Sequence, residues 1–232
     1  MFDPSNPDMK CTKFPKDQID IRFASTGDLI DNIPTICGGH LFIAKGDKKY
    51  PKTCSALGNP NMTMEMLESR TYASSVLLNS TTLWVMGGYN EWDIVLNSTE
   101  FVTWEKSPIK GPTLPSPLHA PCSVKYNSTS IYIIGGNRKN ENTWIFDPSN
   151  NFFVRKGPSM QTGRRFHSCG IVRSKGMSYI VVAGGVFGQG VGTITNSVEI
   201  LDPMSNKGWI KGKPGLAISV ISHTQYSSVK YK

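Results

Sequence analysis

Four histidines are the first residues to test for chemistry, because imidazole serves both as a metal ligand and as a general base. They are His40, His119, His167 and His223. The short spacings typical of metal sites, His-x-His, His-x-x-x-His and Cys-x-x-Cys, are absent from the sequence. The Gly-x-Ser-x-Gly nucleophile motif and a phosphate-binding loop are absent too. We therefore expect no catalytic residue, no metal and no cofactor.

Glycine pairs recur along the chain and indicate how the remaining residues are organised. The pairs are Gly38-Gly39, Gly87-Gly88, Gly135-Gly136 and Gly184-Gly185, spaced by 49, 48 and 49 residues. Internal repeats of this length are typical of arrays and propellers. The glycine pairs are therefore assigned a structural role in a repeated unit.

Each glycine pair ends a short apolar run that predicts a buried strand. These runs are 33–37, 83–86, 131–134 and 179–183. Further strands are predicted upstream at 72–78, 122–126 and 166–173, and downstream at 97–102, 142–148 and 196–203. An outer strand then carries Trp104, Phe152-Phe153 or Trp209. A unit of four short antiparallel strands cannot bury both faces alone, so we predict an all-β protein whose units stack around an axis as a β-propeller.

The pattern resembles the kelch repeat in the run ending in Gly-Gly, the Glu-aromatic or Asp-Pro strand after it, and the later Trp strand. Arg164-Arg165-Phe166-His167-Ser168 also resembles that family. The resemblance covers residues 70–230, and before them only the pair at Gly38 follows it. It implies a propeller of four-stranded blades. His167 and His223 occupy the same repeat position, so we expect each to make a structural hydrogen bond.

The repeat divides the single expected domain, residues 1–232, into about four blades and two partial ones. The approximate units are 1–22 (partial), 23–70, 71–118, 119–164, 165–215 and 216–232 (partial). Closed propellers use about four to eight blades, and kelch-like ones commonly have six or seven, so we expect an incomplete ring. The alternative is a small ring in which the terminal strands complete one shared blade. Self-association through the unclosed blade edges is a further expectation.

The five cysteines are Cys11, Cys37, Cys54, Cys122 and Cys169. Cys37 ends a predicted strand and Cys54 lies in its predicted antiparallel neighbour, which brings the two within reach of a disulfide. A Cys37–Cys54 disulfide is one prediction, and free buried thiols are the alternative. Cys122 and Cys169 are assigned to equivalent positions of adjacent units, aligned with Ser74, and are expected to be small core residues.

Four Asn-x-Ser/Thr sequons are candidate sites of N-glycosylation. They are Asn61, Asn79, Asn97 and Asn127. Two of them lie at matched hairpin turns, where a glycan would be accessible, although Asn-Ser-Thr is also a good turn sequence. Together with a disulfide, the sequons favour an extracellular or cell-surface glycoprotein, and a cytoplasmic location is the alternative.

The longest predicted loops, 40–52, 89–96, 137–142 and 186–196, share one face of such a fold, where recognition residues commonly lie. Their aromatic and basic side chains are the candidate binding residues: Lys48, Lys49, Tyr89, Trp92, Arg138, Lys139 and Phe187. Aromatic and arginine side chains dominate interface energetics, and basic ones select an acidic partner.

Composition narrows the class of function. With 38% hydrophobic and 18% charged residues the chain can form a core, and its net charge of +8 is too small to indicate nucleic-acid binding. No apolar run is long enough to span a membrane. We expect a non-catalytic module that binds another, acidic protein. The alternatives are a galactose-oxidase-like or glycan-processing enzyme on the propeller, and a substrate adaptor of an intracellular complex.

Overall fold

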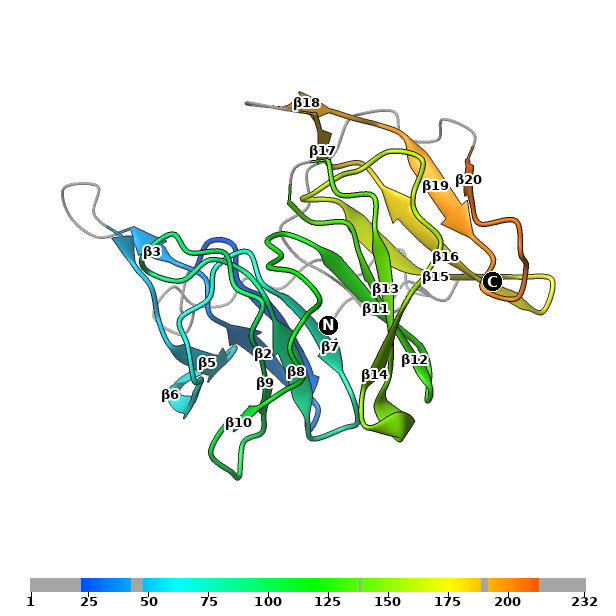
Figure 1. Ribbon diagram of the computed structural model, residues 1–232. Helices are drawn as coiled ribbons and strands as arrows, with labels where there is room; N and C mark the ends of the chain where they lie inside the picture. The colour runs from blue at the N-terminus through cyan, green and yellow to red at the C-terminus, as the bar shows by residue number, and fades with distance from the viewer. Residues whose placement is uncertain (1–21, 43–47, 138, 189–191, 213–232) are drawn as a thin grey trace, which may run out of the picture.

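The computed structural model describes residues 22–42, 48–137, 139–188 and 192–212. Within these ranges the chain is all-β, and its helical structure amounts to one 3-10 turn at Pro148–Asn150. Four four-stranded antiparallel sheets follow one another along the chain (Figure 1). Among the described residues no sheet closes on itself.

The strand order within each sheet follows the chain, as expected for meanders joined by short turns. The first sheet contains β1 (Thr26–Ile30), β2 (Ile33–Cys37), β5 (Thr53–Ala56) and β6 (Asn59–Glu65). The second contains β7 (Ser74–Leu77), β8 (Leu83–Met86), β9 (Thr99–Val102) and β10 (Ile109–Lys110). The third contains β11 (Cys122–Asn127), β12 (Ser130–Ile134), β13 (Thr143–Asp147) and β14 (Phe153–Lys156). The fourth contains β15 (Ser168–Ser174), β16 (Met177–Ala183), β19 (Val198–Leu201) and β20 (Trp209–Lys211).

Two small ribbons project beyond the glycine pairs. One pairs β3 (Leu41–Phe42) with β4 (Lys48–Lys49), and the other pairs β17 (Val186–Phe187) with β18 (Thr193–Ile194). They lie within two of the long loops expected to carry binding residues.

The second strand of each inner sheet is buried on both faces, because neighbouring sheets pack against it. In β8 all four side chains, from Leu83 to Met86, have no exposed area. In β12, Ile131 to Ile134 are at most 4% exposed. Three apolar clusters fill the spaces between consecutive sheets. The core is therefore a series of inter-sheet junctions rather than one central cluster.

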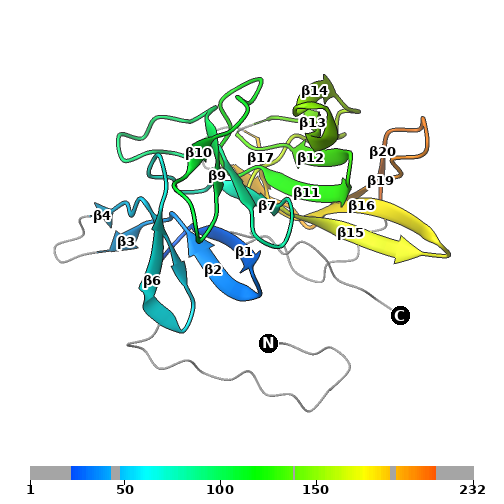
Figure 2. The same ribbon diagram turned by 90° about the horizontal axis from the view of Figure 1, so that it is seen from below.

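The first strands of consecutive sheets, β1, β7, β11 and β15, lie nearest one another (Figure 2). Hydroxyl pairs join them at two junctions. Thr26 Oγ1 lies 2.6 Å from Ser75 Oγ, and Ser74 Oγ lies 2.5 Å from Ser123 Oγ. Both pairs join the opening residue of one strand to the second residue of the next sheet's strand. The junctions therefore repeat in atomic detail.

Disulfides occur at two places. Cys37 and Cys54, which are direct partners in the β2–β5 register, form one. Cys122 and Cys169 form the other, so the expectation of two free core thiols was wrong. In the strand register, Cys122 lies opposite the residue just before a glycine pair. Cys169 lies opposite the residue one position earlier, so Cys169 is equivalent to Ser75 and not to Ser74. The third junction thus has a disulfide where the other two have a hydroxyl pair.

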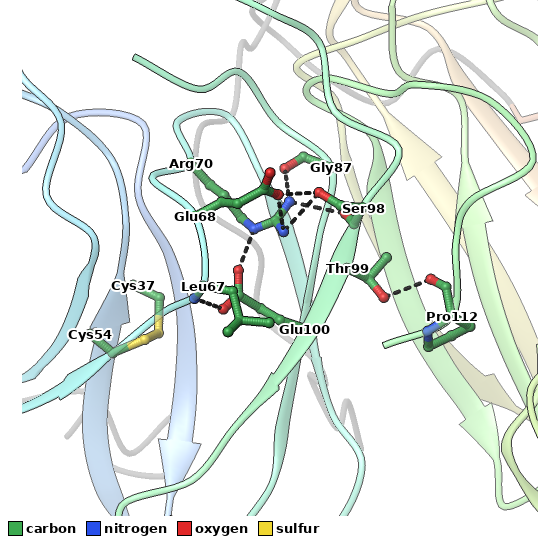
Figure 3. A network of polar contacts seen from close by, with 10 residues as sticks. All are labelled: Cys37, Cys54, Leu67, Glu68, Arg70, Gly87, Ser98, Thr99, Glu100 and Pro112. Atoms are coloured by element: carbon green, nitrogen blue, oxygen red, sulfur yellow. Dashed lines mark hydrogen bonds and ion pairs between the residues drawn. A yellow bond between two sulfur atoms is a disulfide. The ribbon is translucent and has the colours of Figure 1, made fainter. Parts of the chain in front are cut away.

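A buried arginine joins the second sheet to the chain that enters it (Figure 3). Arg70 is 1% exposed, and its Nε donates to Glu100 Oε1 at 2.7 Å. Its Nη1 donates to the carbonyls of Gly87 and Ser98, both at 3.0 Å, and Nη2 binds Glu68. The carboxylates balance the buried guanidinium charge, which would otherwise be costly.

The fourth sheet repeats this arrangement. Arg164 has no exposed area, and its Nη2 lies 2.7 Å from Glu199 Oε1. Its Nη1 donates to the carbonyls of Gly184 and Ser197 at 3.0 Å. The same residue types therefore hold a glycine pair and a third strand together in both sheets.

The first and third sheets vary the arrangement. In the third sheet Leu118 takes the position of the arginine and Trp144 that of the glutamate. Strand register establishes the position of Trp144, and a glycine N–H that donates to the Leu118 carbonyl establishes that of Leu118. In the first sheet Arg22 is retained, and Ser55 replaces the glutamate, accepting from Arg22 Nη2 at 2.6 Å. The buried arginine–glutamate ion pair is therefore one of three residue combinations that the sheets use at these equivalent positions.

His167 does not make the hydrogen bond we expected. The residue is 2% exposed, and neither ring nitrogen has a hydrogen-bond partner in the part of the chain that the structure describes. Burial, and next the charge of Arg164, lower the pKa of His167 to about 3. The ring packs against Gly135, where a Cβ would lie 2.9 Å from its Cε1. Its role is packing as a neutral ring; the equivalent His223 lies outside the described residues.

Candidate binding surface

Each unit enters its sheet through one residue in the left-handed backbone region. Ala24, Tyr72, Ala120 and Phe166 have φ values of 55°, 55°, 50° and 55°. The N–H of Tyr72 donates to the Ala24 carbonyl at 2.9 Å, that of Ala120 to Tyr72 at 2.8 Å, and that of Phe166 to Ala120 at 3.2 Å. This chain of hydrogen bonds ties the glycine-pair ends of all four sheets together.

Two of these four residues carry bulky rings. A positive φ is unfavourable for a large side chain, and such residues cluster at functional sites. Tyr72 and Phe166 nevertheless lie edge to face, with ring centroids 5.2 Å apart. The backbone ladder therefore holds two aromatic side chains from different sheets against each other.

Three more rings extend this pair into an aromatic–histidine cluster of His40, Tyr72, Tyr89, His119 and Phe166. Ring centroids are 4.5 Å apart for Tyr89 and His119, and 6.5 Å apart for Tyr72 and Tyr89. His119 and Phe166 are 6.1 Å apart, and His40 and Tyr72 are 6.2 Å apart. The cluster draws on all four units. The histidines are buried and the other three rings are partly exposed.

Hydrogen bonds fix the proton on His119. Asn137 Oδ1 lies 2.7 Å from His119 Nδ1, and Arg165 Nη1 lies 3.0 Å from His119 Nε2. Arginine can only donate, so Nε2 accepts and Nδ1 carries the hydrogen. The Arg165 guanidinium also lies 5.0 Å from the Phe166 ring centroid, a cation–π distance. One positive charge is thus held against the aromatic rings.

His40 is the second neutral histidine of the cluster. It is 4% exposed, and its Nδ1 lies 3.1 Å from Thr71 Oγ1. Burial lowers the pKa of His40, and the positive charge of Lys48 lowers it further. The imidazole therefore contributes a ring face and a hydrogen bond rather than a charge.

The β3–β4 ribbon extends the surface outward from His40. Phe42 is 56% exposed and lies 5.2 Å from His40, centroid to centroid. Phe23 is 51% exposed and 5.0 Å from Phe42, and Lys48 Nζ lies 5.8 Å from the Phe42 ring. Burial and the negative charge of Asp93 raise the pKa of Tyr50, which places the 90–95 loop beside the ribbon.

Some of the residues singled out by sequence lie in or beside this cluster. Tyr89 is one of its members, and Lys48 and Lys49 are exposed on the neighbouring ribbon. Trp92 is 71% exposed in the loop next to that ribbon, with its backbone N–H donating to Asn90. These residues from the loops of the first and second sheets therefore lie on one surface.

The remaining predicted residues lie elsewhere or outside the described chain. Lys139 is exposed in its loop, and Phe187, 36% exposed, lies on β17. No ring contact in the described ranges links either residue to the cluster. Arg138 lies outside the described residues.

Sequence reasoning missed most of the cluster. It assigned Tyr72 and Phe166 to strands and His40 to a loop, and it included neither His119 nor Arg165 among the candidate binding residues. One signal was present: Tyr72 and Phe166 each follow an equivalent arginine by two residues. Contacts between rings on different sheets leave no pattern along the sequence.

The four sequons are all on exposed asparagines: Asn61, Asn79, Asn97 and Asn127. Asn79 and Asn127 lie at the first hairpin turns of the second and third sheets. In both, Oδ1 accepts from the threonine two residues later, with Thr81 N and Thr129 N each at 2.9 Å. These turns are at the strand ends opposite the glycine pairs, so they lie away from the aromatic–histidine cluster.

Within the described ranges, no three His, Cys, Asp or Glu side chains are grouped to hold a metal ion. No helix of the described chain has the length and apolar character needed to cross a bilayer.

Comparison with known proteins supports the fold. A solved structure described as "Structure of YjhT" superposes with a TM-score of 0.62, at 17% sequence identity, over 87% of this chain and 68% of that chain. No family model matches the sequence. A search of curated proteins likewise returns no match. The solved structure therefore shares with this chain an arrangement of antiparallel sheets.

Proposed function

We propose that the four sheets are blades of an incomplete kelch-type β-propeller and that the chain is a non-catalytic protein-interaction module. The repeated junctions support the propeller, because each sheet meets the next through equivalent positions of its first strand. The left-handed ladder supports it further, since it links equivalent residues of all four sheets. A rigid array of this kind presents its loops as a fixed surface.

The aromatic–histidine cluster is the observation on which the binding function rests. It combines partly exposed rings with a guanidinium held on Phe166, the residue types that dominate protein interfaces. Arg165, Lys48 and Lys49 make this end cationic, while Glu91 and Asp93 offset part of that charge. The proposed partner is therefore an acidic protein that also inserts an apolar side chain.

A binding role without covalent chemistry fits the state of the histidines. Both ring nitrogens of His119 are hydrogen-bonded, and His167 is sealed in the core. The pKa of His40 is lowered, and its ring is almost fully buried. Neither His119 nor His167 therefore offers the accessible nitrogen that general base catalysis requires.

We propose an extracellular or cell-surface location, because disulfides persist in oxidising compartments. Two disulfides and the exposed sequon turns support this location. Glycans on Asn79 and Asn127 would leave the aromatic–histidine cluster uncovered, as both turns are at the opposite strand ends.

The function can be tested by selecting displayed random peptides against the full chain produced through a secretory pathway. We expect acidic peptides with one aromatic or aliphatic anchor. Their affinity should fall at least about tenfold on Tyr89→Ala and on Arg165→Ala, as is typical of interface hot spots. Thermal melts of each variant establish that it folds.

Phe153→Ala provides a matched control, because Phe153 is 59% exposed on β14 and not in the cluster. Its peptide affinity should equal that of the unchanged chain. Peptides that bind folded Tyr89→Ala and Arg165→Ala as tightly as the unchanged chain would remove the cluster from the proposed function.

A further inference from the structure

The first three sheets bury the side that faces the next sheet, and the fourth sheet has the same side half-exposed. The residue before each glycine pair shows this. Cys37, Met86 and Ile134 are 1%, 0% and 0% exposed, whereas Ala183 is half-buried. This side of the fourth sheet, at β15, β16 and β19, is named the next-facing side.

Other positions repeat the contrast. Trp84 and Tyr132 are 0% and 4% exposed, and Val181, in the same register, is half-buried. Val76 and Val124, both 1% exposed, correspond to Gly170, where a Cβ would meet nothing within 4 Å. The next-facing side of the fourth sheet consists of Gly170, Val172, Tyr179, Val181, Ala183, Val198 and Ile200. None of these residues belongs to the three core clusters.

The first sheet shows the complementary surface. Positions that face the preceding sheet hold Leu83 and Ile180 in the second and fourth sheets, both with no exposed area. The equivalent residue in the first sheet, Pro34, is exposed. Leu29 is 40% exposed, and Ile36 is half-buried. This side of the first sheet is named the previous-facing side.

The previous-facing side is also built in the same way as its counterparts within the molecule. Arg22 donates to the Gly38 carbonyl at 3.3 Å and to the Thr53 carbonyl at 2.6 Å, as Arg70 and Arg164 do in their sheets. The first sheet thus has the apolar positions and the arginine clamp that the second and fourth sheets present to a preceding sheet.

We propose that the next-facing side of the fourth sheet binds the previous-facing side of the first sheet in a second copy of this chain. One chain carries both halves of a contact that it already makes three times internally, so a second copy is the occupant that the repeat specifies. The contact is head-to-tail, and such contacts close into a ring or extend into filaments. The two sides are apolar, so their association excludes water from surface that is otherwise partly exposed.

A head-to-tail contact makes a distinctive prediction for mixed variants. Val181→Asp damages the next-facing side only, and Ile36→Asp damages the previous-facing side only. Each variant alone should be a monomer in sedimentation velocity, with association weakened at least about tenfold by the buried charge. Mixed in equal amounts, the two should form a 1:1 dimer and nothing larger, because only one intact contact remains.

The unchanged chain should show concentration-dependent species larger than a monomer, and Phe153→Lys should behave in the same way. Melts of every variant establish that each one folds. A monomeric unchanged chain, as would result if residues outside the described ranges cover the two sides, overturns the proposal. So does a mixture of the two variants that stays monomeric, or assembly that neither variant weakens.

Discussion

The second and third sheets solve the same problem with opposite chemistry. Both must hold a glycine pair and a third strand against the chain that enters the sheet. The second sheet uses Arg70 and Glu100, both fully buried and 2.7 Å apart. The third sheet has Leu118 and Trp144 in the same positions, with Leu118 fully buried. Relative to the second sheet, the third sheet differs at both positions together, and none of the four sheets keeps the glutamate without the arginine.

The comparison indicates that a fully buried arginine at this position occurs together with its glutamate: the second and fourth sheets keep both residues and the third keeps neither, whereas Arg22, which has Ser55 in place of the glutamate, is only partly buried. A buried ion pair gains little over well-packed apolar residues, whereas one charge left alone in the core is strongly destabilising. The third junction shows the exchange of a complete pair at a different position, because a disulfide there replaces a hydroxyl pair. The most informative changes therefore break one member of a pair or exchange one complete pair for another.

The largest effect is expected for Glu199→Gln. Arg164 has Glu199 as its ion-pair partner among the described residues, and both side chains are at most 1% exposed. Losing that carboxylate leaves a buried guanidinium charge and should lower the free energy of unfolding by about 3–5 kcal/mol. Urea denaturation measures the change. Glu100→Gln should be less severe because Glu68 still pairs with Arg70, and equal losses in the two variants would contradict this account.

The next effect is expected for the double change Cys122→Ser and Cys169→Ser, which copies the hydroxyl junctions. The disulfide closes a sequence separation of 47 residues. Its removal should lower the free energy of unfolding by about 2–4 kcal/mol, because the unfolded chain regains conformational freedom. Denaturation of the oxidised proteins checks this value. A loss well below 1 kcal/mol would mean that the serine pair replaces the cross-link fully.

The pH dependence of stability should identify His167 as a buried neutral group. Its pKa is about 3 in the folded chain, against 6.5 for an ordinary histidine. Between these values the unfolded chain binds a proton that the folded chain excludes, so stability is full above about pH 6.5 and falls by about 1.4 kcal/mol per unit below it. His167→Leu should reduce this slope between pH 6.5 and 5; an unchanged slope would show that other groups cause it.

The smallest effect is expected for the exchange of a complete pair. Arg70→Leu with Glu100→Trp transfers the apolar solution of the third sheet to the second. The double variant should unfold within about 1–2 kcal/mol of the unchanged chain, since no buried charge is left without its partner at these two positions. It should be more stable than Arg70→Leu alone. Equal or lower stability would show that the exchange depends on the surrounding sheet.

The repeat made much of the fold predictable. Glycine pairs and the apolar runs before them predicted the second strand of every sheet, and β2, β8, β12 and β16 occupy those runs. Third strands proved shorter than expected at 99–102 and 198–201, because the carbonyl of the serine before each of them accepts a hydrogen bond from the arginine of the entering chain instead. Local pattern was thus sufficient for strand identity and weaker for strand ends.

The candidate site was much less predictable. Tyr89, Lys48 and Trp92 were chosen because loops carry aromatic and basic residues. Tyr72 and Phe166 were not, because their importance comes from a left-handed backbone and a 5.2 Å contact across sheets. Such contacts join residues 94 positions apart in the sequence. No local periodicity reports them.

The sequence by itself determined the repeat, the all-β class and the antiparallel neighbours Cys37 and Cys54, because these depend on short-range spacing and strand alternation. Tertiary structure decided the Cys122–Cys169 disulfide, the neutral state of His119 and the sides of the first and fourth sheets that stay half-exposed. The physical reason is strand geometry: a shift of one residue moves a side chain to the other face of its sheet. Which side chains meet across a junction is therefore set only when the sheets pack.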